Sequence, residues 1–429
     1  EQQTMRRVSY SDRYVNSSHV AEAMVRSRIV AILATCSMGK STSIDEVLTA
    51  EGNPPVMFVA CRIVHALDGS TQFGLDLYNS PNDAPGHEKR STTIHSLHKY
   101  DEWFKEHGHE GVLVLDELRS ILACLNDKTF KDRGSVALLD KMMKQSRVIA
   151  ADADLMCDGM CEHFLTHFGT DVELIEYTHK PNPRTIEAVC GDGGYDYWKA
   201  MFELRVQRGD NLFLHINSVS KASEYADFCK KHGVIFKLYT SDCTDSKDDF
   251  KDPDSAWEET QVIITTSTVT VAVDPKKWHC DHVMIYAGAG YGCSPRDQGQ
   301  GSLRIGRRGI GAGPGMLSNP VVLTYFDKTA LDGDSTGSSP TSSPDEIFDI
   351  KLKDINWKTQ RKRRKIDENH DIVNQSSTTS APAWLNGVLA WQDVEDDMYR
   401  YFLLHVWEEM CERRGWTFVM RTDYDALPA

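Results

Sequence analysis

The chain has 429 residues, which predicts two or three domains, and 40% of them are hydrophobic, which is enough for sizeable cores. Its formal net charge of −15 excludes a protein that coats nucleic acid with its whole surface, although a locally basic channel would still bind it. No apolar run reaches the ~18 residues of a membrane span, and the 11 cysteines form no disulfide framework. We therefore expect no membrane partner and a reducing compartment, the cytoplasm or the nucleus.

Four short hydrophobic runs in the first part of the chain predict buried parallel strands. Each run is nearly continuous and ends in small or acidic residues, as a strand covered on both faces does. Helical stretches such as residues 134–146 lie between these runs. The alternation predicts a doubly wound α/β domain over residues 1–185. The four runs are residues 28–34, 56–61, 111–117 and 147–154.

The same alternation restarts in the middle of the chain and predicts a second α/β domain over residues 186–327. The helix predicted at 220–233 has Ser220 as its N-cap and Gly233 as its stop signal. The strands predicted here are residues 211–217, 234–240, 261–267 and 282–288.

The last part of the chain differs in composition. Residues 328–383 are predicted to be a flexible linker, because 332–346 is rich in Ser, Pro and Gly. The basic run at 361–365 is typical of a nuclear localisation signal, a DNA contact or solvated linker charge. Residues 384–429 are predicted to be the helical start of a C-terminal region, with a helix over 384–414. Because the chain begins with Glu1 rather than Met, we interpret it as a fragment.

A phosphate-binding loop is predicted directly after the first hydrophobic run. Gly39 lets backbone N–H groups approach a phosphate, Lys40 reaches the β- and γ-phosphates of ATP, and the Ser41 hydroxyl binds Mg²⁺. The residues that follow can open a helix whose N-terminus favours anions. A chance Gly-Lys-Ser in a turn is the alternative. The residues of the predicted loop are Ala34, Thr35, Cys36, Ser37, Met38, Gly39, Lys40, Ser41 and Thr42.

An acidic pair follows the third hydrophobic run, where open α/β sheets bind nucleotides. Asp116 is a candidate Mg²⁺ ligand, and Glu117 is a candidate for orienting the water that attacks the γ-phosphate. The alternative interpretation is that this pair only caps a helix.

A third motif lies in the second predicted domain. Gln300, Arg304 and Arg307 are spaced so that they share one face of a helix. Arginines on such a face can stabilise the charge on a γ-phosphate, as arginine fingers do. The alternatives are a solvated basic surface or a patch that contacts nucleic acid only.

These three motifs, in this order on two successive α/β domains, resemble those of a superfamily 2 helicase. Within that superfamily, the sequences of four segments are most similar to those of the herpesvirus-type replication origin-binding helicases and their cellular and giant-virus relatives. The similar segments are "STTIHSLHKYDEW", "LDELRSILACL", "TTSTVTVAVD" and "SPRDQGQGSLRIGR", and the resemblance covers about residues 10–330. It implies two tandem RecA-like P-loop domains with parallel sheets, which close on ATP and move along single-stranded DNA.

The resemblance implies roles for further residues. Arg62, Ser96 and His98 match positions that contact the nucleic-acid backbone from the first domain, and Thr265 and Thr266 match such positions in the second. The residues matched to positions that couple hydrolysis to strand movement are Asp152, Asp154 and Asp274. Ordinary structural roles are the alternatives: Arg62 as a surface side chain, His98 as a polar helix residue, an aspartate as a helix cap, and the Thr-rich run as a good strand.

Three positions depart from the family pattern. Ser37, Ala272 and Leu303 each stand where the family has glycine, and each places a Cβ where close backbone approach is normal. The charged groups needed for hydrolysis are all present. The motifs predict Mg-ATP hydrolysis, with ATP and Mg²⁺ as cofactors, and the resemblance implies an ATP-dependent DNA helicase or translocase of replication. Its expected partners are single-stranded DNA and other replication proteins, and the basic run favours the nucleus. The alternatives are an RNA helicase of the same superfamily and a decayed, non-catalytic scaffold.

Overall fold

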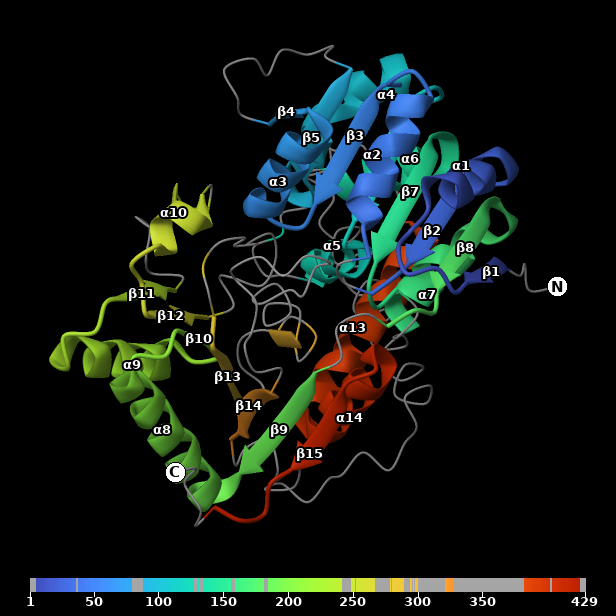
Figure 1. Ribbon diagram of the computed structural model, residues 1–429. Coiled ribbons are helices and arrows are strands. Elements are labelled where there is room, and N and C mark those ends of the chain that lie inside the picture. Colours follow the sequence, from blue (N-terminus) through green and yellow to red (C-terminus); the bar gives the residue numbers. More distant parts are fainter. Residues whose placement is uncertain are drawn as a thin grey trace, which may run out of the picture. The chain divides into compact units, whose positions relative to one another are not determined.

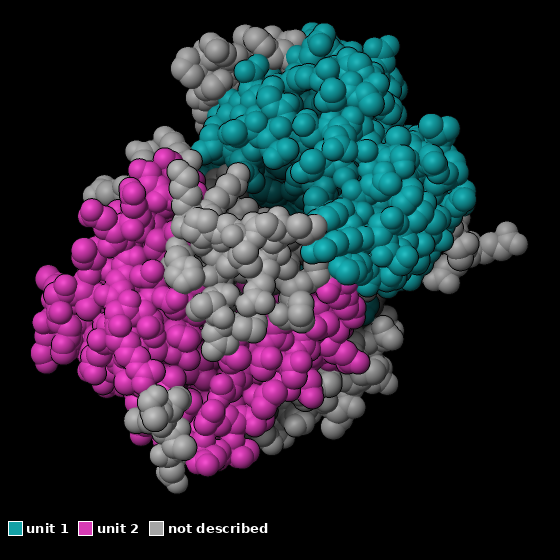
Figure 2. All heavy atoms as spheres, in the orientation of Figure 1, with its two compact units in different colours: residues 1–179, 340–395 teal, residues 180–339, 396–429 magenta. Residues whose placement is uncertain are grey.

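The computed structural model describes two compact units of the chain. Unit 1 comprises Glu1–His179 with Pro340–Glu395, and unit 2 comprises Lys180–Ser339 with Asp396–Ala429 (Figure 2). Within the described residues, no helix is both long and apolar enough to cross a membrane. The described residues are 5–35, 38–78, 88–126, 130, 134–155, 159–180, 184–240, 248–250, 252–266, 278, 280–288, 294, 296, 298–299, 321–327, 382–401 and 403–424.

Unit 1 is built on an eight-stranded sheet in the order β1-β8-β2-β7-β6-β3-β5-β4, and its described strand pairs are parallel (Figure 1). The four strands predicted in this part of the sequence are present as β2, β3, β6 and β7. β1 and β5 were not predicted, because their sequences, "RRVSY" and "KRSTT", are largely polar. The strands are β1 (Arg6–Tyr10), β2 (Ile29–Leu33), β3 (Val56–Ala60), β4 (Asp76–Leu77), β5 (Lys89–Thr93), β6 (Val112–Asp116), β7 (Arg147–Asp152) and β8 (Val172–Tyr177).

Two hydrophobic cores lie on the two faces of this sheet. Leu113 and Leu115 of β6 belong to one core, and Val112 and Val114 belong to the other. Side chains of a strand alternate between faces, so a strand that is apolar at every position must be covered on both sides. The helices of unit 1 supply this cover. They are α1 (Ser17–Arg26), α2 (Lys40–Ala50), α3 (Ile63–Phe73), η1 (Ile94–Tyr100), α4 (Asp101–His107), α5 (Leu118–Ala123), η2 (Cys124–Asn126), α6 (Ser135–Gln145), α7 (Gly159–Phe168) and η3 (Gly169–Asp171).

Unit 2 has a seven-stranded sheet in the order β11-β12-β10-β13-β14-β9-β15, and its described pairs are also parallel. The two parallel-sheet units confirm the predicted α/β class. The strands are β9 (Thr185–Cys190), β10 (Leu212–Ile216), β11 (Phe236–Tyr239), β12 (Val262–Thr265), β13 (His282–Ala287), β14 (Val321–Phe326) and β15 (Thr417–Met420). The helices are α8 (Gly191–Arg208), α9 (Val219–Lys231), η4 (Asp248–Phe250), α10 (Pro253–Trp257) and α14 (Leu403–Arg414).

The start of α9 corrects one sequence prediction. Ser218, rather than Ser220, is the N-cap, and its hydroxyl accepts a hydrogen bond from the Lys221 backbone N–H at 3.4 Å. Both serines are good cap residues, and the chain turns into the helix at the earlier one. The predicted stop is supported by Gly233, whose φ of 67° is the left-handed conformation that glycine adopts easily.

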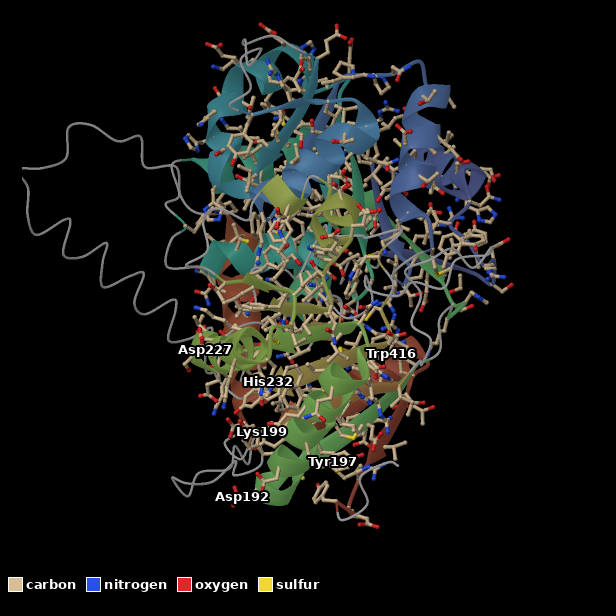
Figure 3. All side chains as sticks on the ribbon, turned by 60° about the vertical axis from the view of Figure 1, so that its left-hand side comes forward. Asp192, Tyr197, Lys199, Asp227, His232 and Trp416 are labelled. Atoms are coloured by element: carbon tan, nitrogen blue, oxygen red, sulfur yellow. The ribbon has the colours of Figure 1, made fainter. Side chains whose placement is uncertain are left out.

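The C-terminal segment contributes to both units. The helix predicted over residues 384–414 is present as two helices, α13 (Ala383–Tyr401) and α14. Trp384 lies in a core of unit 1, and its indole N–H donates to Asp140 at 3.0 Å. In unit 2, β15 pairs with β9, and Arg421 lies over the ring of Tyr197, which Figure 3 labels on α8. The predicted linker lies outside the described residues apart from its last two positions.

Candidate nucleotide site

Three neighbouring strands of unit 1 carry the candidate residues at one edge of the sheet. β2, β7 and β6 are adjacent and parallel, so their carboxyl ends lie side by side. Ala34 follows β2, Asp152 ends β7 and Asp116 ends β6. The Ala34 N–H donates to the backbone carbonyl of Asp152 at 3.3 Å, which joins the first two strand ends. Open α/β sheets bind ligands at this edge.

The predicted phosphate loop leads into helix α2. Gly39 is the N-cap of α2 with a φ of 76°, and Lys40 and Ser41 begin its first turn. Lys40 is buried, and its Nζ donates to the carbonyl oxygens of Ala34 at 2.7 Å and Thr35 at 3.4 Å. The ammonium group is therefore held across the loop, where it can exchange these carbonyls for a phosphate. Cys36 and Ser37 lie outside the described residues.

Oxygen ligands face one another where α2 meets β6. The Ser41 hydroxyl and Oδ2 of Asp116 are 3.5 Å apart, and the hydroxyl donates to the carboxylate. A hydroxyl and a carboxylate are the ligand types that Mg²⁺ prefers in proteins. The hydroxyl oxygen of Thr35 in the same loop is buried and has no hydrogen-bond partner. The Ser41 and Asp116 oxygens therefore suit Mg²⁺, and the phosphate loop beside them holds an unsatisfied polar atom that a ligand could satisfy.

Glu117 has an unusual backbone conformation. Its φ of 56° and ψ of 54° are left-handed, a geometry shared only by Asn53 among the described residues other than glycine. Such conformations cost of order 1–3 kcal/mol in side-chain-bearing residues and cluster at functional sites. The Glu117 side chain is buried and makes no capping hydrogen bond to α5. Glu117 occupies the N-cap position of α5, but its side chain does not cap the helix.

Asp152 caps α5 from a neighbouring strand. One carboxylate oxygen accepts the Arg119 N–H at 2.9 Å, and the other accepts the Asp154 N–H at 2.9 Å. Both aspartates are buried. Asp152 therefore connects the phosphate loop, the helix after Asp116 and the loop after β7. The alternative interpretation of the sequence was that one of these aspartates caps the helix that follows β7. Asp152 instead accepts the N–H of Arg119, which belongs to α5.

Sequence reasoning missed a histidine in this site. His65 lies in the first turn of α3 and is 2% exposed. Its Nε2 is 3.4 Å from Oδ2 of Asp116. Burial lowers the pKa of His65, but hydrogen bonds to Asp116 and Cys61 outweigh burial and raise the pKa to about 10. In the sequence, this histidine resembled an ordinary helix residue, because no local pattern links it to Asp116.

The candidate nucleic-acid residues of unit 1 follow two adjacent strands. β3 pairs with β5, Arg62 comes shortly after β3, and Ser96 lies in η1 after β5. Arg62 is exposed at the N-cap of α3, and Ser96 is half-buried. Both residues therefore lie at the same edge of the sheet as the candidate nucleotide site. His98 is half-buried, and its backbone N–H donates to the Ser135 hydroxyl at 3.1 Å.

The candidate residues of unit 2 are buried or lie outside the described residues. The Thr265 hydroxyl contacts Nδ1 of His215 and the carbonyl of Leu214, both at 3.2 Å. The Thr266 hydroxyl donates to the carbonyl of Tyr239 at 3.3 Å. A nucleic-acid contact would require these hydroxyls to change partners. Gln300, Arg304, Arg307 and Asp274 lie outside the described residues, as do Ala272 and Leu303.

Comparison with known proteins places the fold. No protein-family model matches the sequence, and neither does any curated protein. Dbp5 from S. cerevisiae, bound to RNA and ADP BeF3, matches with a TM-score of 0.51 and 13% identity, over 70% of this chain and 79% of that one. Mss116p, bound to ssRNA and AMP-PNP, matches with a TM-score of 0.52 and 12% identity, over 97% of this chain and all of that one (100%).

A DNA-bound protein has a similar structure. The DUF1998 helicase MrfA bound to DNA matches with a TM-score of 0.52 and 10% identity, over 74% of this chain and 47% of that one. The chain has the tandem RecA-like fold that these structures share. Sequence identities this low establish the helicase fold alone. Within this helicase fold, the carboxyl edge of the first sheet carries Lys40, Ser41 and Asp116.

Proposed function

We propose that the chain is an ATP-dependent helicase or translocase that moves on single-stranded nucleic acid. The observation that carries the proposal is the convergence of Lys40, Ser41 and Asp116 at one sheet edge. Lys40 lies across the loop at 2.7 Å from the Ala34 carbonyl, and Ser41 lies 3.5 Å from Asp116. A phosphate-binding cation and two oxygen ligands for a divalent metal are thus held within one helical turn and one strand end.

Each residue of this group has a proposed role. The backbone of residues 34–42 and Lys40 would hold the phosphates of ATP. Ser41 and Asp116 would hold Mg²⁺, which neutralises phosphate charge when it is bound. Glu117 would orient the attacking water and accept its proton. Gln300, Arg304 and Arg307 are proposed from the sequence motif to stabilise charge on the γ-phosphate.

Asp152 is proposed to couple hydrolysis to movement on the strand. It touches Ala34 through its carbonyl and Arg119 through its carboxylate, so a displacement of the loop would reach α5. Asp154 supports it through its own N–H. Asp274 is assigned a matching role in unit 2 by the sequence resemblance alone.

We propose DNA as the substrate and replication as the process, because the motifs resemble those of origin-binding helicases. Arg62 and Ser96, at one edge of unit 1, would contact the backbone phosphates together with Thr265 and Thr266 of unit 2. RNA is the alternative, since the structures of Dbp5 and Mss116p are described with RNA and that of MrfA with DNA. No described residue is assigned to a ribose 2′-hydroxyl, so the substrate must be decided by assay.

The test is an ATPase assay without nucleic acid, with single-stranded DNA and with single-stranded RNA. We expect DNA to stimulate the wild-type rate more than RNA, and we expect Lys40→Ala to abolish the stimulated rate. Greater stimulation by RNA would support the RNA helicase. A rate that no nucleic acid changes would favour a non-catalytic scaffold, and an unaffected Lys40→Ala variant would contradict the proposed ATP site.

A further inference from the structure

A buried histidine lies beside the candidate Mg²⁺ ligand. Nε2 of His65 is 3.4 Å from Oδ2 of Asp116, and the Ser41 hydroxyl lies 3.5 Å from the same oxygen. Oδ2 of Asp116 is therefore contacted by the His65 imidazole of α3 and by the Ser41 hydroxyl of α2. The other oxygen of Asp116 accepts the Glu117 backbone N–H at 3.2 Å.

The surroundings of His65 fix the orientation of its ring. The residue is 2% exposed, and its ring packs against Phe58 in an edge-on arrangement with centroids 5.6 Å apart. The Asp116 side chain is 14% exposed, so it is less deeply buried than the imidazole that it contacts. A buried polar ring without a partner is costly, and the carboxylate supplies one. The packing thus aims Nε2 at Asp116.

We propose that His65 is a positioning residue, which holds the Asp116 carboxylate in the orientation that binds Mg²⁺. The inference rests on the proposed function, because it needs Asp116 to be a metal ligand. Partners behind a metal ligand orient it, and their loss typically costs 10–100-fold in metal affinity. Without the Nε2 donor, the Asp116 carboxylate would lose one of the contacts that limit its rotation about the Cβ–Cγ bond, and fewer molecules would present it correctly.

Two variants separate a hydrogen-bonding role from a packing role. His65→Phe keeps a ring of similar shape but removes the donor. His65→Gln places an amide N–H close to the position of Nε2 and so restores the donor without the ring. His107→Phe is the matched control, because His107 is a histidine of unit 1 that packs on Trp103 with an 18% exposed side chain, at the end of α4.

The measurement is the binding of a fluorescent ATP analogue, N-methylanthraniloyl-ATP, as Mg²⁺ is titrated and again in EDTA. We expect His65→Phe to need about 10–100-fold more Mg²⁺ for half-maximal binding. We expect His65→Gln and His107→Phe to resemble the wild type. Binding in EDTA should be equal in all four proteins, because it depends on Lys40 and the loop, and this equality also shows that the variants are folded.

Three outcomes decide the matter. A wild-type Mg²⁺ requirement in His65→Phe would overturn the inference. Equal losses in His65→Phe and His65→Gln would also overturn it, because the ring rather than the donor would then be needed. If the wild type binds no nucleotide with or without Mg²⁺, the proposed function itself fails, and that result is distinct from either of the others.

Discussion

Arg119 and Glu395 form a buried ion pair within unit 1, although they lie 276 residues apart along the chain. Their side chains are 6% and 9% exposed. Arg119 belongs to α5, which begins directly after Glu117, and Glu395 belongs to α13. The pair thus joins α13 to α5, the helix that follows the candidate site.

Breaking this pair is expected to destabilise unit 1. Glu395→Leu leaves a buried guanidinium without its carboxylate, so the free energy of unfolding should fall by about 3–5 kcal/mol. The double variant Arg119→Met/Glu395→Leu should recover most of the loss, because well-packed apolar residues can replace a buried pair. Urea unfolding followed by circular dichroism measures both. Asp393→Asn is the control, since its contact with Asn126 is exposed. A double variant as unstable as the single one would contradict this account.

Gly39→Ala is expected to weaken nucleotide binding through the backbone alone. A Cβ at Gly39 would meet nothing within 4 Å, but the φ of 76° would be strained by about 1–2 kcal/mol for alanine. In the free variant the loop is expected to relax out of this conformation, so ATP binding must restore it, and that cost corresponds to about 5–30-fold weaker binding. Gly52→Ala is the matched control, with a φ of 83° and nothing within 4 Å of the added Cβ. Calorimetric titration with ATP would contradict the expectation if both variants bound equally well.

Ser37→Gly is expected to tighten ATP binding and to raise turnover. Glycine removes the Cβ at the position where the family pattern has none, so loop amides can approach phosphate more closely. The measurement is kcat and KM for ATP beside the wild type. Slower turnover with weaker binding would show that Ser37 contributes through its hydroxyl.

Two variants of Glu117 should separate the backbone strain at this residue from the role of its carboxylate in hydrolysis. Glu117→Gln removes the proposed base, so hydrolysis should fall by about 10²–10⁴-fold while ATP binding stays unchanged. Glu117→Gly should raise the free energy of unfolding by about 1 kcal/mol, because glycine adopts the φ of 56° without strain. Asn53→Gly, at a φ of 59°, is the comparison for the strain effect alone. A destabilised Glu117→Gly variant would refute the strain argument.

The stability of unit 1 should fall as the pH drops below about 6.5, in part because of His163 on α7. Burial, and then the neighbouring His167, lower the pKa of His163 below its ordinary value of 6.5. Above that pH both the folded and unfolded forms are neutral. Below it the unfolded form takes up the proton first, so stability is lost until the pH reaches the lowered folded pKa.

Thermal unfolding between pH 7 and pH 5 tests this expectation. His163→Gln should lose less stability over that range than the wild type. His167→Gln is the comparison, because burial also lowers the pKa of His167. Identical pH dependence in wild type and His163→Gln would exclude His163 as a contributor.

The sequence by itself predicted the elements whose pattern is local. The continuous apolar runs gave β2, β3, β6 and β7, because a strand covered on both faces must be apolar at successive positions. The sequence also predicted the phosphate loop at Gly39 and Lys40 and the acidic pair that begins at Asp116, since each motif consists of residues adjacent along the chain. β1 and β5 were not predicted, because both are largely polar.

Only the tertiary structure decided which distant residues meet. His65 lies against Asp116, Asp152 caps α5, and Glu395 pairs with Arg119. Each contact joins two elements that are far apart along the chain and pack together only in the folded protein. The C-terminal segment likewise adds Trp384 to one unit and β15 to the other. Periodicity reports which face of an element is buried, but not which partner covers it. The sequence by itself therefore determined which residues are candidates for the site, and packing between segments far apart in the chain determined which groups contact them.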